Sequence, residues 1–225
     1  MSSEPRVGHV VWDWNGTILD DNDAVVSAVN AVCTAFGRDH IDLDYWRSIY
    51  RRPLSEGYQE LLARELSTQD WVEVDRLYHD AYRALLPTTR LAPGIPDELH
   101  RWRATGGQQS LLSMWFHDQL VPAVERHGLT RHFARIDGLR AEVGGGHKAP
   151  HLAAHVAAMG VDGADCVMIG DSVDDALAAA SVGARCVLYS GGFTDAARLA
   201  EVGVPVVDSL TEAVAIAAAA ESART

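Results

Sequence analysis

The sequence contains almost no lysine. Of its 19 basic residues only Lys148 is a lysine, and arginine supplies every other fixed positive charge. Codon bias with one accidental lysine would explain this number. The alternative is that one position requires a compact ammonium group, and the residues around Lys148 decide between these interpretations.

Positive charge of any kind is scarce. The 19 basic side chains stand against 31 acidic ones, which gives a formal net charge of −12. Nucleic acid and anionic membranes repel such a chain, so the composition predicts neither as a partner. A small polar substrate is the better match. The sequence leaves the oligomeric state open between a monomer and a homodimer.

Cysteines and long apolar runs are also rare. Cys33, Cys166 and Cys186 lie in apolar segments without the spacing of a metal site, which predicts buried thiols in a reducing compartment. Residues 1–8 contain no apolar signal core, and no window approaches the length needed to cross a bilayer. We therefore expect a cytoplasmic protein. Its 225 residues suffice for one full core plus a smaller appended unit.

The most informative stretch is residues 10–17, where a short apolar run stops at Asp13 and continues into Asn15, Gly16 and Thr17. This pattern is typical of a buried parallel strand that ends at a ligand-binding edge. Gly16 permits a turn that a side chain would obstruct, and Thr17 offers a hydroxyl and an amide to an anion. Asp13 is therefore a candidate nucleophile, metal ligand or both, although an isolated string of this kind often only caps a turn.

The segment after this strand predicts helices alone. Apolar residues recur at helical spacing over about 22–36, 43–50, 54–66 and 67–85, without an intervening strand. Pro87 and the Pro93-Gly94 pair mark the end of this segment. The pattern predicts a small helical bundle inserted after the first strand.

The rest of the chain alternates between strands and helices. Strands are predicted near 109–114, 133–136, 166–169, 186–189 and 204–207, with helical segments between them and a capping box at Ser209 that opens the last helix. Such alternation predicts an α/β fold with a doubly wound parallel sheet and right-handed crossovers.

Polar groups at the strand ends of this sheet suit one reaction. Ser113 ends the second strand, Lys148 opens a helix, and Asp171 and Asp175 follow a later strand. Loops at one edge of a parallel sheet converge, so these side chains should surround Asp13. The carboxylates would repel one another without a cation, and oxygen ligands favour Mg²⁺. Ser113 would donate to a phosphoryl oxygen, and Lys148 would pair with Asp13.

Together, residues 13–17, Ser113, Lys148 and residues 170–175 resemble the four signature motifs of the haloacid dehalogenase superfamily, in the same order. The resemblance implies a Rossmann-like catalytic core over residues 1–19 and 89–225, and an α-helical cap domain over residues 20–88. Its nearest general likeness is the phosphoglycolate-phosphatase-like branch.

The resemblance also implies a Mg²⁺-dependent phosphohydrolase for a small phosphorylated metabolite. Asp13 would be the nucleophile that forms an aspartyl-phosphate. Asp13, the main-chain carbonyl of Asn15 and Asp171 would hold the Mg²⁺, with Asp175 in support.

Asn15 departs from the family pattern. Phosphatase members carry a second aspartate at this position, which protonates the leaving oxygen and then activates water, and an amide can do neither. The cap has no lysine for phosphonate hydrolysis, and Ser113 and Lys148 argue against a dehalogenase. Two hypotheses remain: a phosphohydrolase that favours leaving groups needing no protonation, or a low-turnover or inactive protein that binds phosphate ligands or is phosphorylated.

Further candidates are contacts to the substrate. Gly16, Thr17 and Met114 lie in the motifs, whereas Arg51 and Arg52 interrupt the cap helices, where related phosphatases have a specificity loop. A solvated surface pair is an equally good interpretation of the two arginines. His117, near Ser113, is a candidate replacement for the missing proton carrier, although a histidine at a helix start is more often polar surface.

Overall fold

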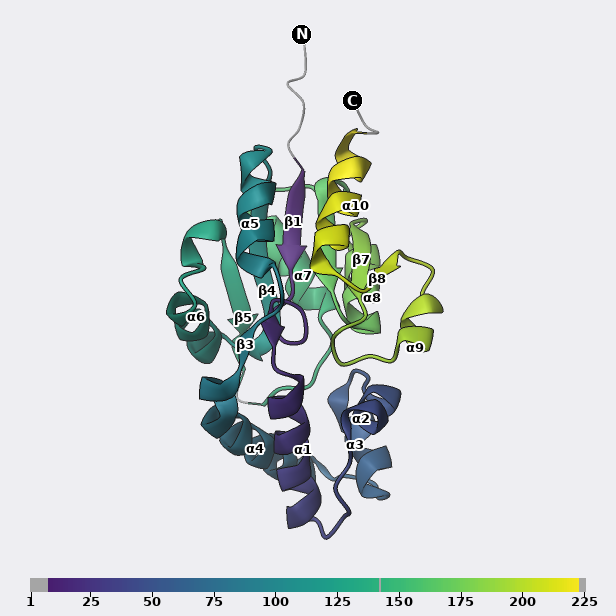
Figure 1. Ribbon diagram of the computed structural model, residues 1–225. Coiled ribbons are helices and arrows are strands. Elements are labelled where there is room, and N and C mark those ends of the chain that lie inside the picture. Colours follow the sequence, from purple (N-terminus) through teal and green to yellow (C-terminus); the bar gives the residue numbers. More distant parts are fainter. Residues whose placement is uncertain (1–7, 142, 223–225) are drawn as a thin grey trace.

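A parallel sheet forms the centre of the protein (Figure 1). Within residues 8–141 and 143–222, which the computed structural model describes, six strands pair in the order β5-β4-β1-β6-β7-β8, every pair parallel. They are β1 (His9–Trp12), β4 (Gln108–Phe116), β5 (Ile136–Leu139), β6 (Cys166–Gly170), β7 (Arg185–Tyr189) and β8 (Val206–Val207). Because β1 pairs with both β4 and β6, its end lies in the middle of one sheet edge.

Helices cover both faces of this sheet. On one face lie α5 (Ile95–Ala104), α6 (His117–Arg126) and α10 (Leu210–Ser222), and on the other lie α7 (Ala149–Met159), α8 (Val173–Ser181) and α9 (Ala196–Ala200). The continuous apolar run of β1 explains this arrangement, because Val10 packs into the first layer and its neighbour Val11 into the second. The predicted doubly wound α/β fold is confirmed.

A second group of helices stands beyond the carboxyl ends of β1 and β4 (Figure 1). It comprises α1 (Asn22–Ala35), α2 (Leu43–Ile49), α3 (Leu54–Leu62) and α4 (Thr68–Leu85). The chain enters and leaves this group through an antiparallel ribbon of β2 (Leu19–Asp20) and β3 (Arg90–Leu91), in which Leu19 pairs with Leu91. The sequence did not predict this ribbon, since each of its strands has only two residues. The cap boundaries at residues 20 and 88 stay a prediction.

Apolar packing and hydrogen bonds join the two parts. One hydrophobic cluster runs from Trp12 in the sheet to Trp46 and Val74 among the helices. Arg47 on α2 donates from Nε to the Gly192 carbonyl oxygen at 2.8 Å, which ties the helical group to the loop after β7. Side-chain packing and hydrogen bonds thus hold the helical group against the sheet on both sides of the space between them.

Some predicted boundaries were wrong. The strand expected at 133–136 lies at Ile136–Leu139, because Phe133 ends a 3-10 turn (Thr130–His132) and donates its N–H to the Thr130 carbonyl oxygen at 3.2 Å. β4 continues past Ser113 to Phe116, and β8 has only two residues. Further 3-10 turns lie at Leu86–Thr88 and Gly163–Asp165. No helix in the described residues is both long and apolar enough to cross a membrane.

Candidate active site

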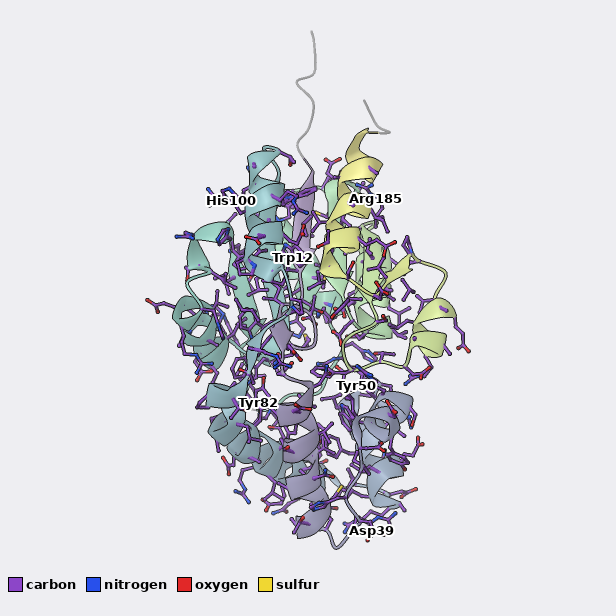
Figure 2. All side chains as sticks on the ribbon, in the orientation of Figure 1. Trp12, Asp39, Tyr50, Tyr82, His100 and Arg185 are labelled. Atoms are coloured by element: carbon purple, nitrogen blue, oxygen red, sulfur yellow. The ribbon has the colours of Figure 1, made fainter. Side chains whose placement is uncertain are left out.

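The predicted site residues meet in a recess between the sheet edge and the helical group. Asp13, Asn15, Ser113, Met114 and Lys148 all line it. Figure 2 shows Tyr50 and Tyr82 at the junction of the two parts, where this recess lies, whereas Trp12 lies within the sheet. The convergence follows from topology, because β1, β4 and β6 are adjacent and parallel.

Lys148 is buried and bound to two carboxylates. Its Nζ lies 2.8 Å from Asp13 Oδ1 and also contacts Asp175 Oδ1, while only 2% of the residue is exposed. Burial lowers the pKa of Lys148, but Asp13 and Asp175 outweigh that effect and raise it, so the ammonium stays charged. The Lys148 N–H also donates to Asp174 Oδ2 at 2.8 Å, which fixes the start of α7.

Asp171 lies beside this ion pair and is held by different donors. The Thr17 hydroxyl donates to its Oδ1 at 3.2 Å, and the Phe193 N–H donates to its Oδ2 at 2.7 Å. Gly16 adopts φ +71°, and a Cβ there would lie 2.6 Å from Asp171 Oδ2. Glycine at position 16 is therefore needed both for its left-handed backbone and for the close approach of this carboxylate.

The carboxylates suit a divalent cation. One oxygen from each of Asp13, Asp171 and Asp175 lies within 4.8 Å of the others. Burial raises the pKa of Asp13, and burial with the neighbouring carboxylates raises the pKa of Asp171 well above its usual range. Lys148 supplies one positive charge against three carboxylates, so a bound cation would relieve the repulsion that remains. The all-oxygen donor set fits Mg²⁺.

Asn15 is held in a network that the sequence did not predict. Its Nδ2 donates to Asp21 Oδ2 and to the Tyr82 hydroxyl, both at 2.8 Å, so both amide hydrogens are used. Its Oδ1 accepts from the Ser113 hydroxyl at 3.3 Å. Asn15 therefore links the Ser113 hydroxyl on β4 to Tyr82 on α4, and has no hydrogen left for a leaving group.

Asp21 is the buried carboxylate of this network. It accepts from the Gly16 N–H at 2.8 Å and from the Tyr82 hydroxyl at 2.6 Å, and it is 2% exposed. Burial raises its pKa to about 6. The sequence did not single out Asp21, because Tyr82, which completes its surroundings, is 61 positions away.

The two adjacent arginines separate. Arg52 lines the recess, where its Nη1 donates to the Gly146 carbonyl oxygen at 2.9 Å and its Nε lies 3.7 Å from Asp174 Oδ2. Arg51 turns away from it and pairs with Glu60 at 2.8 Å. Substrate contact by Arg52 thus stays a prediction that the geometry permits, whereas Arg51 sits in a surface ion pair.

Three other candidates are engaged elsewhere. His117 accepts from the Gly138 N–H at 3.1 Å and contacts Arg140 at 2.8 Å, outside the residues that line the recess. The Gly16 N–H is bound to Asp21, and the Thr17 hydroxyl to Asp171. Gly16 and Thr17 thus hold carboxylates in place, and a substrate contact for either stays a prediction.

A family profile described as haloacid dehalogenase-like hydrolase matches residues 7–183, well over half of the chain. The chain belongs to this family. The predicted resemblance and hydrolase class are thereby confirmed for this haloacid dehalogenase-like hydrolase.

Known relatives and solved structures agree with this assignment. Phosphoglycolate phosphatase from Agrobacterium fabrum is 26% identical over 203 residues, covering 87% of this chain and 85% of the relative. Phosphoglycolate phosphatase 1 from Pseudomonas aeruginosa is 26% identical over 224 residues, covering 92% and 78%. A crystal structure described as a predicted phosphatase from Clostridium acetobutylicum has a TM-score of 0.82 at 18% identity, covering 92% and 96%. The structural match shows a shared fold.

Replacing Lys148 tests its buried ion pairs. Lys148→Met keeps the length of the side chain but leaves Asp13 and Asp175 without their cation. We expect hydrolytic turnover to fall on the order of 10²-fold or more, the scale of losing one preorganised electrostatic donor. Arg90→Met is the control, since its ion pair with Asp20 lies on the exposed ribbon and should contribute little. If Lys148→Met lowers turnover by less than about threefold, Lys148 has no role in catalysis and its presence as the single lysine is a matter of codon bias.

Exchanging the amide and the carboxylate tests the Asn15–Asp21 pair. Asn15→Asp alone places two carboxylates where a 2.8 Å hydrogen bond stood, so we expect a lower thermal midpoint at pH 8. The double variant Asn15→Asp/Asp21→Asn keeps the net charge and should recover most of the lost thermal midpoint. We expect an interaction energy between the two side chains of roughly 0.5–3 kcal/mol. Asp21→Asn alone completes the cycle. Additive shifts would show that the two side chains do not interact.

Proposed function

We propose that this protein is a Mg²⁺-dependent phosphohydrolase that acts on a small phosphorylated metabolite through an aspartyl-phosphate on Asp13. The observation that carries the proposal is the buried carboxylate of Asp13, which lines the recess and is bound to Lys148 Nζ at 2.8 Å. Relatives named phosphoglycolate phosphatase support phosphate-ester chemistry.

The reaction would proceed in two displacements at phosphorus. An Asp13 carboxylate oxygen forms a bond to phosphorus while the ester oxygen leaves with its electron pair. Water then attacks the same phosphorus, which releases inorganic phosphate and returns the Asp13 carboxylate. Lys148 would offset charge on the transferring group, and the Ser113 hydroxyl, now bound to Asn15, would turn to a phosphoryl oxygen.

Asp13, Asp171 and the main-chain carbonyl of Asn15 would hold the Mg²⁺. When bound, the cation supplies positive charge between the carboxylates and the phosphoryl oxygens. Asp175 would act in support, because its Oδ1 contacts Lys148 and its Oδ2 accepts from the Ser172 N–H at 3.0 Å. Ser172 and Asp175 form the capping box of α8, so the helix start itself orients this carboxylate.

Asn15 favours one alternative, a low-turnover protein that binds or accepts phosphate without releasing it steadily. Both amide hydrogens of Asn15 are engaged, so this residue cannot protonate the leaving oxygen. Multiple turnovers of phosphate release in Mg²⁺ distinguish the enzyme from this alternative, which predicts at most one phosphate per protein.

Asp13→Asn should abolish Mg²⁺-dependent phosphate release from an activated aryl phosphate, because the amide is a poor nucleophile and a weaker ligand. Its thermal transition should be retained. Asp23→Asn, a change at an exposed carboxylate on α1, serves as the matched control and should keep full activity. Near wild-type release by Asp13→Asn would show that the nucleophile lies elsewhere. Chelation of Mg²⁺ should stop the reaction, and its replacement should restore it.

Arg52 and Arg51 form a matched pair for testing substrate recognition. Arg52→Ala removes a side chain that lines the recess, so it should change the ranking of phosphate esters more than it changes kcat for a minimal aryl phosphate. Arg51→Ala removes ion pairs with Glu56 and Glu60 and hydrogen bonds to nearby carbonyl oxygens, none of them in the recess, so it should change both by less than about twofold. Uniform slowing of every substrate by Arg52→Ala would count against a recognition role.

A further inference from the structure

Aromatic side chains dominate the part of the recess that lies beyond Asp13. Among the described residues, eight of the chain's 16 tryptophan, tyrosine and phenylalanine side chains line it. They include Trp46, Tyr58, Trp71, Tyr82 and Trp115. The recess encloses about 830 Å³ of empty space, a figure that includes open solvent.

These rings form connected walls. Trp46 and Tyr58 meet edge to face with centroids 5.6 Å apart, and Tyr58 meets Trp71 in the same way at 5.7 Å. Among the same lining residues, Trp115 from β4 stands at 89° to Tyr82 from α4, with centroids 5.6 Å apart. Contacts between rings fix the walls before any ligand binds, and such surfaces favour a flat apolar body.

The basic side chains that line the recess all have acidic neighbours. Lys148 is bound to Asp13, Arg52 Nε lies 3.7 Å from Asp174, and His79 Nε2 lies 3.6 Å from Asp75. A substrate carboxylate, such as that of phosphoglycolate, would therefore find no unpaired cation among the described lining residues. An anionic group buried without a partner is costly, so the walls disfavour it.

Some of the aromatic walls also carry polar atoms that lack a partner. Trp46 Nε1, the Tyr58 hydroxyl and Trp115 Nε1 are buried without a hydrogen-bond acceptor or donor in the part of the chain that the structure describes. Each of these side chains is at least nine-tenths buried. Buried indole and phenol groups ordinarily find partners, so heteroatoms on a ring-shaped ligand would complete them.

We propose that the substrate is a phosphate monoester of a planar aromatic hydroxyl compound, whose ring lies against these walls. The inference rests on the proposed phosphohydrolase function and gives its substrate class. Asn15 supports it independently, because an aryloxide leaves with its electron pair and takes its proton later from solvent. The Asp13–phosphorus bond forms as the bond from phosphorus to the aryl oxygen breaks.

The test compares four substrates on the full-length protein in Mg²⁺: 2-naphthyl phosphate, phenyl phosphate, acetyl phosphate and 2-phosphoglycolate. Acetyl phosphate has a good leaving group but no ring, so it separates leaving-group ability from recognition. We expect kcat/KM for 2-naphthyl phosphate to exceed that for phosphoglycolate by about 10²-fold and to exceed phenyl phosphate by roughly tenfold. Acetyl phosphate should show a KM at least about tenfold above that of 2-naphthyl phosphate.

Trp71→Leu removes one wall. It should reduce the ratio of kcat/KM for 2-naphthyl phosphate to that for acetyl phosphate by roughly fivefold. Tyr45→Leu is the matched control, since Tyr45 is an exposed ring on α2 outside the recess and should leave the ratio unchanged. If Trp71→Leu does not fold, inhibition of the unmodified protein by 2-naphthol gives the second measurement, and competitive inhibition is expected.

The outcomes separate the two proposals. Faster turnover of phosphoglycolate than of both aryl phosphates would overturn the aromatic substrate class and leave the phosphohydrolase intact. The same conclusion would follow from an unchanged ratio in folded Trp71→Leu, or from no inhibition by 2-naphthol. Absence of Mg²⁺-dependent phosphate release from all four substrates would instead overturn the proposed function.

Discussion

The buried ammonium of Lys148 is the interaction on which the rest of the site depends. Asp13 and Asp175 both contact it, and Asp171 lies close enough to add its own repulsion. Without this ammonium, three neighbouring carboxylates would repel one another in an environment that disfavours uncompensated charge. The ion pairs with Asp13 and Asp175 offset part of that repulsion, so buried acidic side chains can lie together at this sheet edge. The single lysine of this 225-residue chain is thus the residue whose ammonium is buried against two carboxylates.

The site combines rigid core groups with groups from the helical part. Asp13 and Ser113 are fixed by strands, and Lys148 by the start of α7, whereas Tyr82 reaches Asn15 from α4. Ser113, Asn15 and Tyr82 form a single hydrogen-bonded chain across the junction. A change in the position of Tyr82 would therefore reach the Ser113 hydroxyl of the core through Asn15. Specificity and chemistry are connected here through hydrogen bonds as well as through the shape of the recess.

The positions of the site residues at the strand ends were predictable from sequence, because they depend on local patterns. Asp13 and Asp171 follow buried strands, and parallel strands bring their ends together whatever the rest of the chain does. The Asp21–Tyr82 contact was not predictable, because it joins residues 61 positions apart whose encounter depends on how α4 packs. The different positions of the Arg51 and Arg52 side chains were equally unpredictable, because tertiary contacts decide which way each side chain of a loop points. The aromatic walls come from scattered positions on several elements, so no single stretch of sequence displays them.

The two-stranded ribbon has a consequence for how such a protein can change. Because Leu19 pairs with Leu91, the ends of the intervening segment are already held together, and the entropy of closing that loop grows only slowly with its length. Doubling the inserted segment would cost only about 0.6 kcal/mol of closure entropy. The catalytic sheet can thus accept a quite different insert by recombination without rebuilding its own hydrogen bonds. At Asp21, however, any replacement segment must bring a hydroxyl in place of Tyr82, because a buried carboxylate would otherwise lose a hydrogen-bond donor.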